Sequence, residues 1–211
     1  MSITLLPIMT MSKPDDIVQQ EILQAGLRLY RKYGPDKVTM DEVANATGRS
    51  RTSLYYYYKN REELFQGVLD CIADDVIKEI RRAVSEAGNV HDKIYAFCSA
   101  KISTSNAWRN VFNAMLAAAN AEEQTKNNRI KSILHKKLIH NEGIIVQEIL
   151  SEAMNKNEIR PVSSAEQDML AFILSSSVRG LKSEIYDKND PHNIDEALRL
   201  LTDIVAKWAK V

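Results

Sequence analysis

The sequence predicts an all-α protein of about nine helices, with a three-helix N-terminal domain joined by a long helix to a larger C-terminal helical domain. The 211 residues include only 7 Gly and 5 Pro, too few turn formers for a β-sandwich or barrel. No proline lies between Asp36 and Arg160, a span rich in the helix formers Ala, Leu, Ile, Glu and Lys. Because 45% of the residues are hydrophobic and 27% are charged, the chain can bury a sizeable core.

Composition also limits location and domain organisation. No uncharged apolar run reaches the ~18 residues that a membrane span needs. The two cysteines, Cys71 and Cys98, have no CxxC spacing and are interpreted as reduced core residues of a cytoplasmic protein. We expect residues 1–12 to form a flexible tail, followed by domains at 13–60 and 61–211.

The first two helices have clear boundaries. An apolar period of 3.6 residues predicts a helix over 15–33, which Gly34 and the proline after it stop. Thr39 and Glu42 have the spacing of a capping box, in which each side chain bonds the other residue's backbone amide. This pair predicts a short helix over 40–46.

A third short helix follows after a tight turn. Gly48 suits the turn, and Ser50 is placed to cap a helix over 51–57. Asn60 then caps the next helix. Two short helices joined by a glycine turn form a helix-turn-helix, whose second helix fits a DNA major groove.

Longer helices are expected after this unit. Breaks are predicted at Gly88-Asn89, Ser105-Asn106, Ala121-Glu122, Arg160-Pro161 and Asn189-Asp190-Pro191. The helices between the breaks are expected at 61–86, 91–104, 107–120, 123–156, 164–187 and 192–210. The first of these should connect the two domains rigidly, so that movement in one is felt in the other.

The turn and the third helix concentrate positive charge and tyrosine. The segment 49–61 carries four cations and no acid, although the net charge of the chain is zero. Four consecutive tyrosines, residues 55–58, follow Leu54. Successive helical residues point about 100° apart, so some of these rings must face outward while Leu54 and Tyr58 point into the core. Phosphate oxygens and base edges are suitable partners for exposed phenols beside cations.

A series of motifs runs through the first three expected helices and into the fourth: Ile22-Leu23-x-Ala25, Tyr30-x-x-Tyr33-Gly34, Val38-Thr39-Met40-x-x-Val43-Ala44, Gly48-x-Ser50 and Leu54-Tyr55-x-Tyr57-Tyr58-Lys59-Asn60-Arg61-Glu62-Glu63-Leu64. These residues resemble the N-terminal DNA-binding domain of the TetR family of bacterial regulators. The resemblance covers about 50 residues, and the rest of the chain resembles the family only in helix number and lengths.

The resemblance implies DNA-contacting residues. It implies that base edges are faced by Arg51, Thr52, Ser53 and Tyr55, and that phosphates are held by Thr39, Tyr56, Tyr57 and Arg61. Two positions depart from the family pattern. Arg49 replaces a small apolar residue inside the turn, so its head group is free to add a phosphate contact. Arg61 replaces a lysine and should keep the phosphate contact.

Apolar stripes in the last two helices favour a two-fold dimer. Spacings of three and four residues along 194–208 form a coiled-coil type of seam, and 170–185 offers a matching stripe. The alternative is that both stripes pack only within one subunit. The residues assigned to the dimer interface are Ile173, Leu181, Ile194, Leu201, Ile204 and Trp208.

A face rich in aromatic and Met residues lies between the DNA-binding and dimer segments. Core packing explains such a face, whereas the resemblance implies an effector pocket there. The expected lining residues are Tyr95, Cys98, Trp108, Phe112, Asn113, Met115 and His135. His135 and His140 are five residues apart, too far around a helix to chelate one metal, so neither a metal nor a cofactor is expected.

We therefore expect a homodimeric, non-enzymatic, ligand-responsive repressor. Its partners would be double-stranded, palindromic operator DNA and a small-molecule effector that releases it. A helical protein-binding adaptor without DNA binding is the first alternative, and an all-α enzyme is the second. A steep salt dependence of DNA binding separates the regulator from the adaptor.

Overall fold

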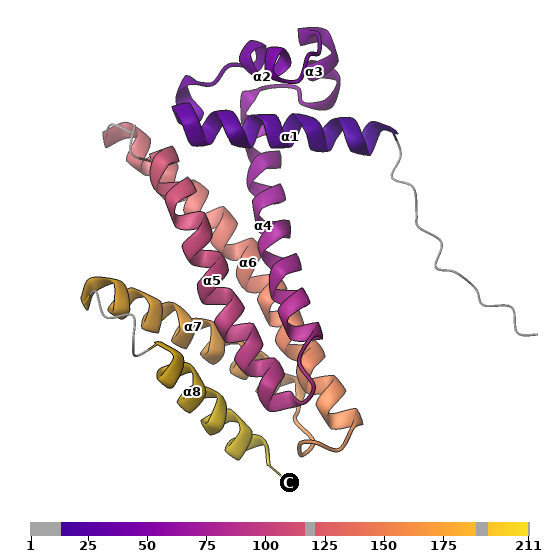
Figure 1. The fold of residues 1–211 in the computed structure, drawn as a ribbon, viewed down its shortest axis with the longest axis vertical. Helices are drawn as coiled ribbons and strands as arrows, with labels where there is room; N and C mark the ends of the chain where they lie inside the picture. The colour runs from indigo at the N-terminus through magenta and orange to yellow at the C-terminus, as the bar shows by residue number, and fades with distance from the viewer. Residues whose placement is uncertain (1–13, 117–120, 189–193, 211) are drawn as a thin grey trace, which may run out of the picture. The chain divides into compact units, whose positions relative to one another are not determined.

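The structure, a computed structural model, describes residues 14–116, 121–188 and 194–210 (Figure 1). The side chains of residues 106–131 lie outside that description, as do the expected tail at 1–12 and the side chain of Ile133. The described residues form eight α-helices and one 3-10 helix. These are α1 (Pro14–Tyr33), η1 (Pro35–Lys37), α2 (Met40–Ala46), α3 (Arg51–Tyr57), α4 (Arg61–Ser85), α5 (Val90–Leu116), α6 (Ala121–Asn155), α7 (Ser164–Lys188) and α8 (Ile194–Ala209).

The chain divides into two compact units, Met1–Leu69 and Asp70–Val211, so the division lies within α4. In the first unit α1 contacts α2 and α2 contacts α3. Its interior includes Ile22, Tyr30 and Leu54, all fully buried. The domain bounds expected from the sequence, 13–60 and 61–211, stay a prediction.

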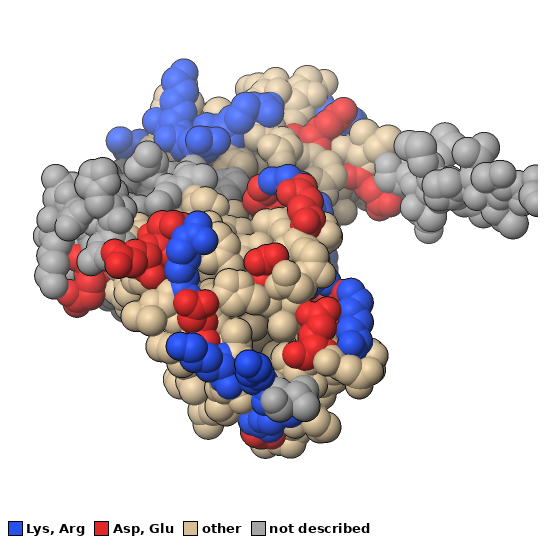
Figure 2. Space-filling model, turned by 60° about the horizontal axis from the view of Figure 1, so that its bottom comes forward, with Lys and Arg blue, Asp and Glu red and all other residues tan. Residues whose placement is uncertain are grey.

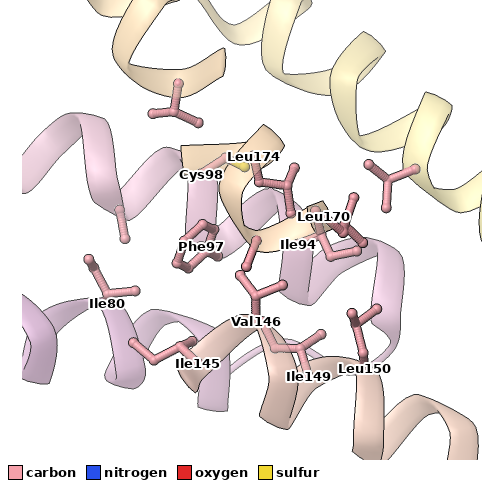
Figure 3. Close-up of a cluster of buried hydrophobic side chains, with 14 of the residues drawn as sticks. Ile80, Ile94, Phe97, Cys98, Ile145, Val146, Ile149, Leu150, Leu170 and Leu174 are labelled. Atoms are coloured by element: carbon pink, nitrogen blue, oxygen red, sulfur yellow. The ribbon is translucent and has the colours of Figure 1, made fainter. Parts of the chain in front are cut away.

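The second unit buries one apolar cluster between its helices (Figure 3). Helix α5 contacts α6, α7 and α8, so it occupies the middle of the unit. Phe97 and Cys98 of α5 point into the cluster, beside Leu174 of α7 and Val146 of α6 (Figure 3). Ile80 adds the inward face of α4 to the same cluster.

The predicted break at Ser105-Asn106 is wrong, because α5 is one helix from Val90 to Leu116. The hydroxyl groups of Ser103 and Thr104 each donate to the carbonyl of Ala100, at 3.0 and 2.7 Å. Short polar side chains that bond back to their own helix do not interrupt it. No glycine or proline lies in this span, and one helix replaces the two expected there, so the described residues form eight α-helices instead of about nine.

Charged side chains of both signs are interspersed over the face shown in Figure 2. On α4, Arg82 pairs with Glu79 and Glu86 of the same helix, at 2.5 and 2.7 Å. Exposed pairs of this kind contribute little to stability. Among the described residues, no helix is long and apolar enough to cross a membrane.

Candidate nucleic-acid interface

Helices α2 and α3 are joined by a turn with several backbone restraints. The amides of Gly48 and Arg49 donate to the carbonyls of Asn45 and Ala44, at 3.1 and 2.9 Å. Gly48 has a φ of 65°, a left-handed conformation that any side chain would strain. The turn therefore fixes the direction in which α3 leaves α2.

The three predicted helix caps are confirmed. The Glu42 amide donates to Thr39 Oγ1 at 3.2 Å, and the Thr39 amide donates back to Glu42 Oε2 at 2.7 Å. Ser50 Oγ accepts from the Ser53 amide at 3.1 Å, which starts α3. Asn60 Oδ1 accepts from the Glu63 amide at 2.8 Å, which starts α4.

Two apolar contacts anchor α3 to the first unit. Leu54 is fully buried and Tyr58 is 4% exposed, as the sequence predicts. The residues between and before them face away, since Arg51, Thr52 and Tyr55 are exposed and Tyr56 is 77% exposed. The exposed face of α3 thus carries a cation, a hydroxyl and two phenols, all of them groups that can bond to DNA.

Carboxylates pair with both arginines of the turn region. Arg51 Nη1 donates to Asp41 Oδ2 of α2 at 3.0 Å, and Arg49 Nη2 donates to Glu21 Oε2 of α1 at 2.7 Å. The hydrogen bond to Tyr55 and the charge of Asp41 raise the pKa of Arg51. The sequence predicts that the Arg49 guanidinium can bind a phosphate, whereas in the structure this group pairs with Glu21 of α1.

The other residues that are expected to contact DNA differ in how exposed their side chains are. Tyr57 is half-buried, and its hydroxyl donates to Asp15 at 3.1 Å; burial and this carboxylate raise the Tyr57 pKa. The Tyr56 and Tyr57 rings meet edge to face, with centroids 5.0 Å apart. Ser53 and Arg61 are half-buried, and Thr39 is exposed at the start of α2. The roles of these residues on DNA stay predictions.

A second polar cluster lies between helices of the second unit. Glu142 of α6 is buried and pairs with Lys101 of α5, while Ser175 of α7 donates to its other oxygen at 3.0 Å. Arg179 Nη1 donates to His135 Nε2 at 2.9 Å. An arginine can only donate, so this His135 nitrogen accepts and the ring is neutral. Burial and the Arg179 charge lower the His135 pKa accordingly.

The residues that are expected to line an effector pocket do not all lie together in the structure. Cys98 and His135 lie near the Lys101–Glu142 pair, and burial raises the Cys98 pKa to about 12. Tyr95 instead faces α8, where its hydroxyl donates to Asp195. The side chains of four expected residues lie outside the described ones, although their backbone belongs to α5: Trp108, Phe112, Asn113 and Met115.

The expected dimer residues divide into two groups. Ile173, Leu201, Ile204 and Trp208 line an apolar groove of ≈ 400 Å³ between α7 and α8, together with neighbours such as Met169. By contrast, Leu181 and Ile194 pack partly against their own core without lining this groove, and Leu201 of the groove also packs against that core. The stripe of α8 that is buried within the subunit is Leu198, Thr202, Val205 and Ala209.

The sequence alone did not predict the carboxylate partners of Arg51 and Lys101. Asp41 is ten residues from Arg51, and Glu142 is far along the chain from Lys101. A lysine and a glutamate on the apolar faces of two long helices were a detectable sign of a buried pair. Within the described part of the chain, no group of three or more His, Cys, Asp or Glu side chains is placed to hold a metal ion.

The first unit has the features of a helix-turn-helix: α2 and α3 are capped and joined by a turn at Gly48, and α3 has an exposed polar face. Residues 22–68 match a family described as "Bacterial regulatory proteins, tetR family". Similar curated proteins are two HTH-type transcriptional regulators of Bacillus subtilis. YfiR is 26% identical over 81 residues, covering 38% of this chain and 37% of YfiR. YhgD is 31% identical over 83 residues, covering 36% of this chain and 41% of YhgD.

The fold similarity extends over nearly the whole chain. The TetR family repressor AlkX from Dietzia sp. strain DQ12-45-1b is 20% identical with a TM-score of 0.58, over 94% of this chain and 96% of AlkX. The matched segment spans less than half the length of either curated relative. Residues 22–68 thus resemble the DNA-binding segment of the tetR family, and the chain is similar in fold to AlkX.

Proposed function

We propose that the protein is a homodimeric transcriptional repressor that binds a palindromic operator and leaves it when a small molecule binds. The observation that carries the proposal is the exposed face of α3, which presents Arg51, Thr52, Tyr55 and Tyr56 on a rigid, capped helix. A helix presented in this way fits the major groove, where such side chains bond base edges and phosphates. Phosphate contacts would come from Thr39, Tyr57 and Arg61, with Ser53 beside the bases.

The groove between α7 and α8 supports the dimer. Exposed apolar side chains are concentrated there, with Ile204 at 55% and Met169 at 58% exposure. Large exposed apolar patches mark interaction sites. A second copy of the same groove is the natural occupant, because a helix-turn-helix reads palindromic DNA through a two-fold pair.

The effector would bind among the helices of the second unit. We assign it the residues Tyr95, Cys98, Trp108, Phe112, Asn113, Met115 and His135, and no metal or cofactor. Support comes from His135, which bonds Arg179 near the buried Lys101–Glu142 pair and has a lowered pKa, because titratable groups with shifted pKa values concentrate at functional sites. The effector acts through α4, whose residues take part in both units. A bound ligand need favour the released state by only ~1–3 kcal/mol to change operator occupancy several-fold.

Selection of genomic DNA fragments by the purified protein tests this function. The expected fragments contain an inverted repeat in intergenic DNA, and their complexes dissociate on addition of one member of a metabolite panel. The same compound should raise the melting temperature of the free protein by mass action. A protein that retains no fragment, but forms a salt-insensitive complex with another protein, is an adaptor instead. Turnover of a panel member would identify an enzyme.

A further inference from the structure

Arg51 is held in place by a carboxylate of the preceding helix. Its Nη1 lies 3.0 Å from Oδ2 of Asp41, which belongs to the first turn of α2. Both side chains are largely exposed, at 63% for Arg51 and 53% for Asp41. Exposed pairs contribute little to folding stability, so stability does not explain this contact.

Tyr55 restrains the same guanidinium from a second side. Its ring centroid is 5.5 Å from the Arg51 guanidinium carbon, and its hydroxyl accepts a long bond from Nη2 at 3.4 Å. A free arginine side chain loses ~2 kcal/mol of rotamer entropy when it is fixed. Because Asp41 and Tyr55 already limit the rotamers, part of that entropy is lost before DNA binds.

The remaining donors of Arg51 match one base. A guanidinium has five N–H groups in one plane, and Asp41 and Tyr55 use one each. The three that remain are enough for the two acceptors, O6 and N7, that guanine shows in the major groove. Adenine shows a donor beside its N7 and would leave one of these N–H groups facing another donor.

We infer that Arg51 reads a guanine in each operator half-site and that Asp41 is the positioning residue that makes this reading selective. The inference rests on the proposed function, since it requires that α3 enter the major groove. A carboxylate beside DNA repels the phosphates, so Asp41 lowers affinity for every sequence. It also disfavours those sequences in which Arg51 cannot reach its guanine, and thereby increases specificity.

Selection from a randomised duplex library tests the inference with the full chain. The wild-type protein should enrich DNA with a guanine at one fixed position of each half-site, about tenfold or more over adenine there. Arg51→Ala should lose this preference. Asp41→Asn should keep Arg51 but lower the guanine preference several-fold, while its affinity for duplex without a site rises. Tyr55→Phe, which keeps the ring, should lower the preference less.

Glu21→Gln is the matched control, because it also removes one carboxylate paired with an arginine, Arg49, outside α3. It should raise affinity for all duplexes and leave the base preference unchanged. Equal melting temperatures of the two variants show that folding is not the cause. An Asp41→Asn protein with the wild-type guanine preference, or a wild-type preference for another base, overturns the inference alone. A wild-type protein that enriches no sequence overturns the proposed function as well.

Discussion

Tyr30 places a hydroxyl group in the interior of the first unit without a hydrogen-bond partner among the described residues. The side chain is fully buried and its ring meets Phe65 edge to face, with centroids 5.4 Å apart. The ring therefore stabilises the unit, whereas the hydroxyl is desolvated without compensation, and burial raises its pKa.

Tyr30→Phe is expected to raise the free energy of unfolding by about 1 kcal/mol, because it removes the uncompensated hydroxyl and keeps the ring. Urea denaturation measures the change. Tyr95→Phe is the matched control, since the Tyr95 hydroxyl donates to Asp195 and its loss should lower stability. A clear loss of stability in Tyr30→Phe would mean that the hydroxyl has a partner in solution.

Lys101 and Glu142 form the most buried ion pair of the described residues, with side chains 14% and 3% exposed. Removing one partner leaves a buried charge unpaired, so Lys101→Met or Glu142→Leu should each cost about 3–5 kcal/mol. The double variant should recover most of this loss, because two apolar side chains replace both charges. A double-mutant cycle, with free energies of unfolding measured in urea, checks this result. A double variant whose loss equals the sum of the two single losses would contradict strong coupling of the two residues.

At the scale of the helices, two histidines give opposite pH dependences. His91 of α5 bonds Asp203 of α8 at 2.9 Å, and this bond raises the His91 pKa above 6.5. The stabilisation is therefore complete below pH ~6.5 and is lost as pH rises through the raised value. His135 has a lowered pKa, so its contribution is present above pH ~6.5 and is lost as pH falls toward that lower value.

Comparison of His91→Gln and His135→Gln with the wild-type protein tests these signs. As pH falls from about 7.5 to about 5.5, the stability advantage of wild type over His91→Gln should grow. Its advantage over His135→Gln should shrink over the same range. Chemical denaturation at a series of pH values provides the data, and parallel curves for the two variants would refute the assigned partners.

The starts of α2, α3 and α4 could be predicted from the sequence because each depends on a local cap. Thr39, Ser50 and Asn60 cap through residues three positions away, so spacing alone shows them. The α5 break was mispredicted because Ser103 and Thr104 bond within the helix instead of ending it. The partners of Arg51 and Lys101 depend on how separate helices pack, which periodicity does not determine.

For the whole molecule, the α7–α8 groove predicts a dimer that a charge should disrupt. Ile204→Glu places a carboxylate in the apolar groove, where pairing two copies would bury it without a partner. Sedimentation should show a monomer that retains its helical spectrum, because Ile204 is 55% exposed in the single chain. Lys207→Glu, at an exposed position of the same helix, should remain dimeric. An unchanged dimer for Ile204→Glu would place the interface elsewhere.

DNA binding by the first unit requires that the association depend steeply on salt. The association constant of the wild-type protein with its selected duplex should fall steeply with salt, by about 0.9 log units per phosphate contact for each tenfold rise. Arg61→Ala should weaken binding to every duplex and lower this slope by about one unit per half-site. Arg51→Ala should instead weaken binding mainly to the selected sequence. A wild-type association that does not change with salt, or equal effects of both variants on random and selected DNA, would show that the first unit does not bind DNA through these residues.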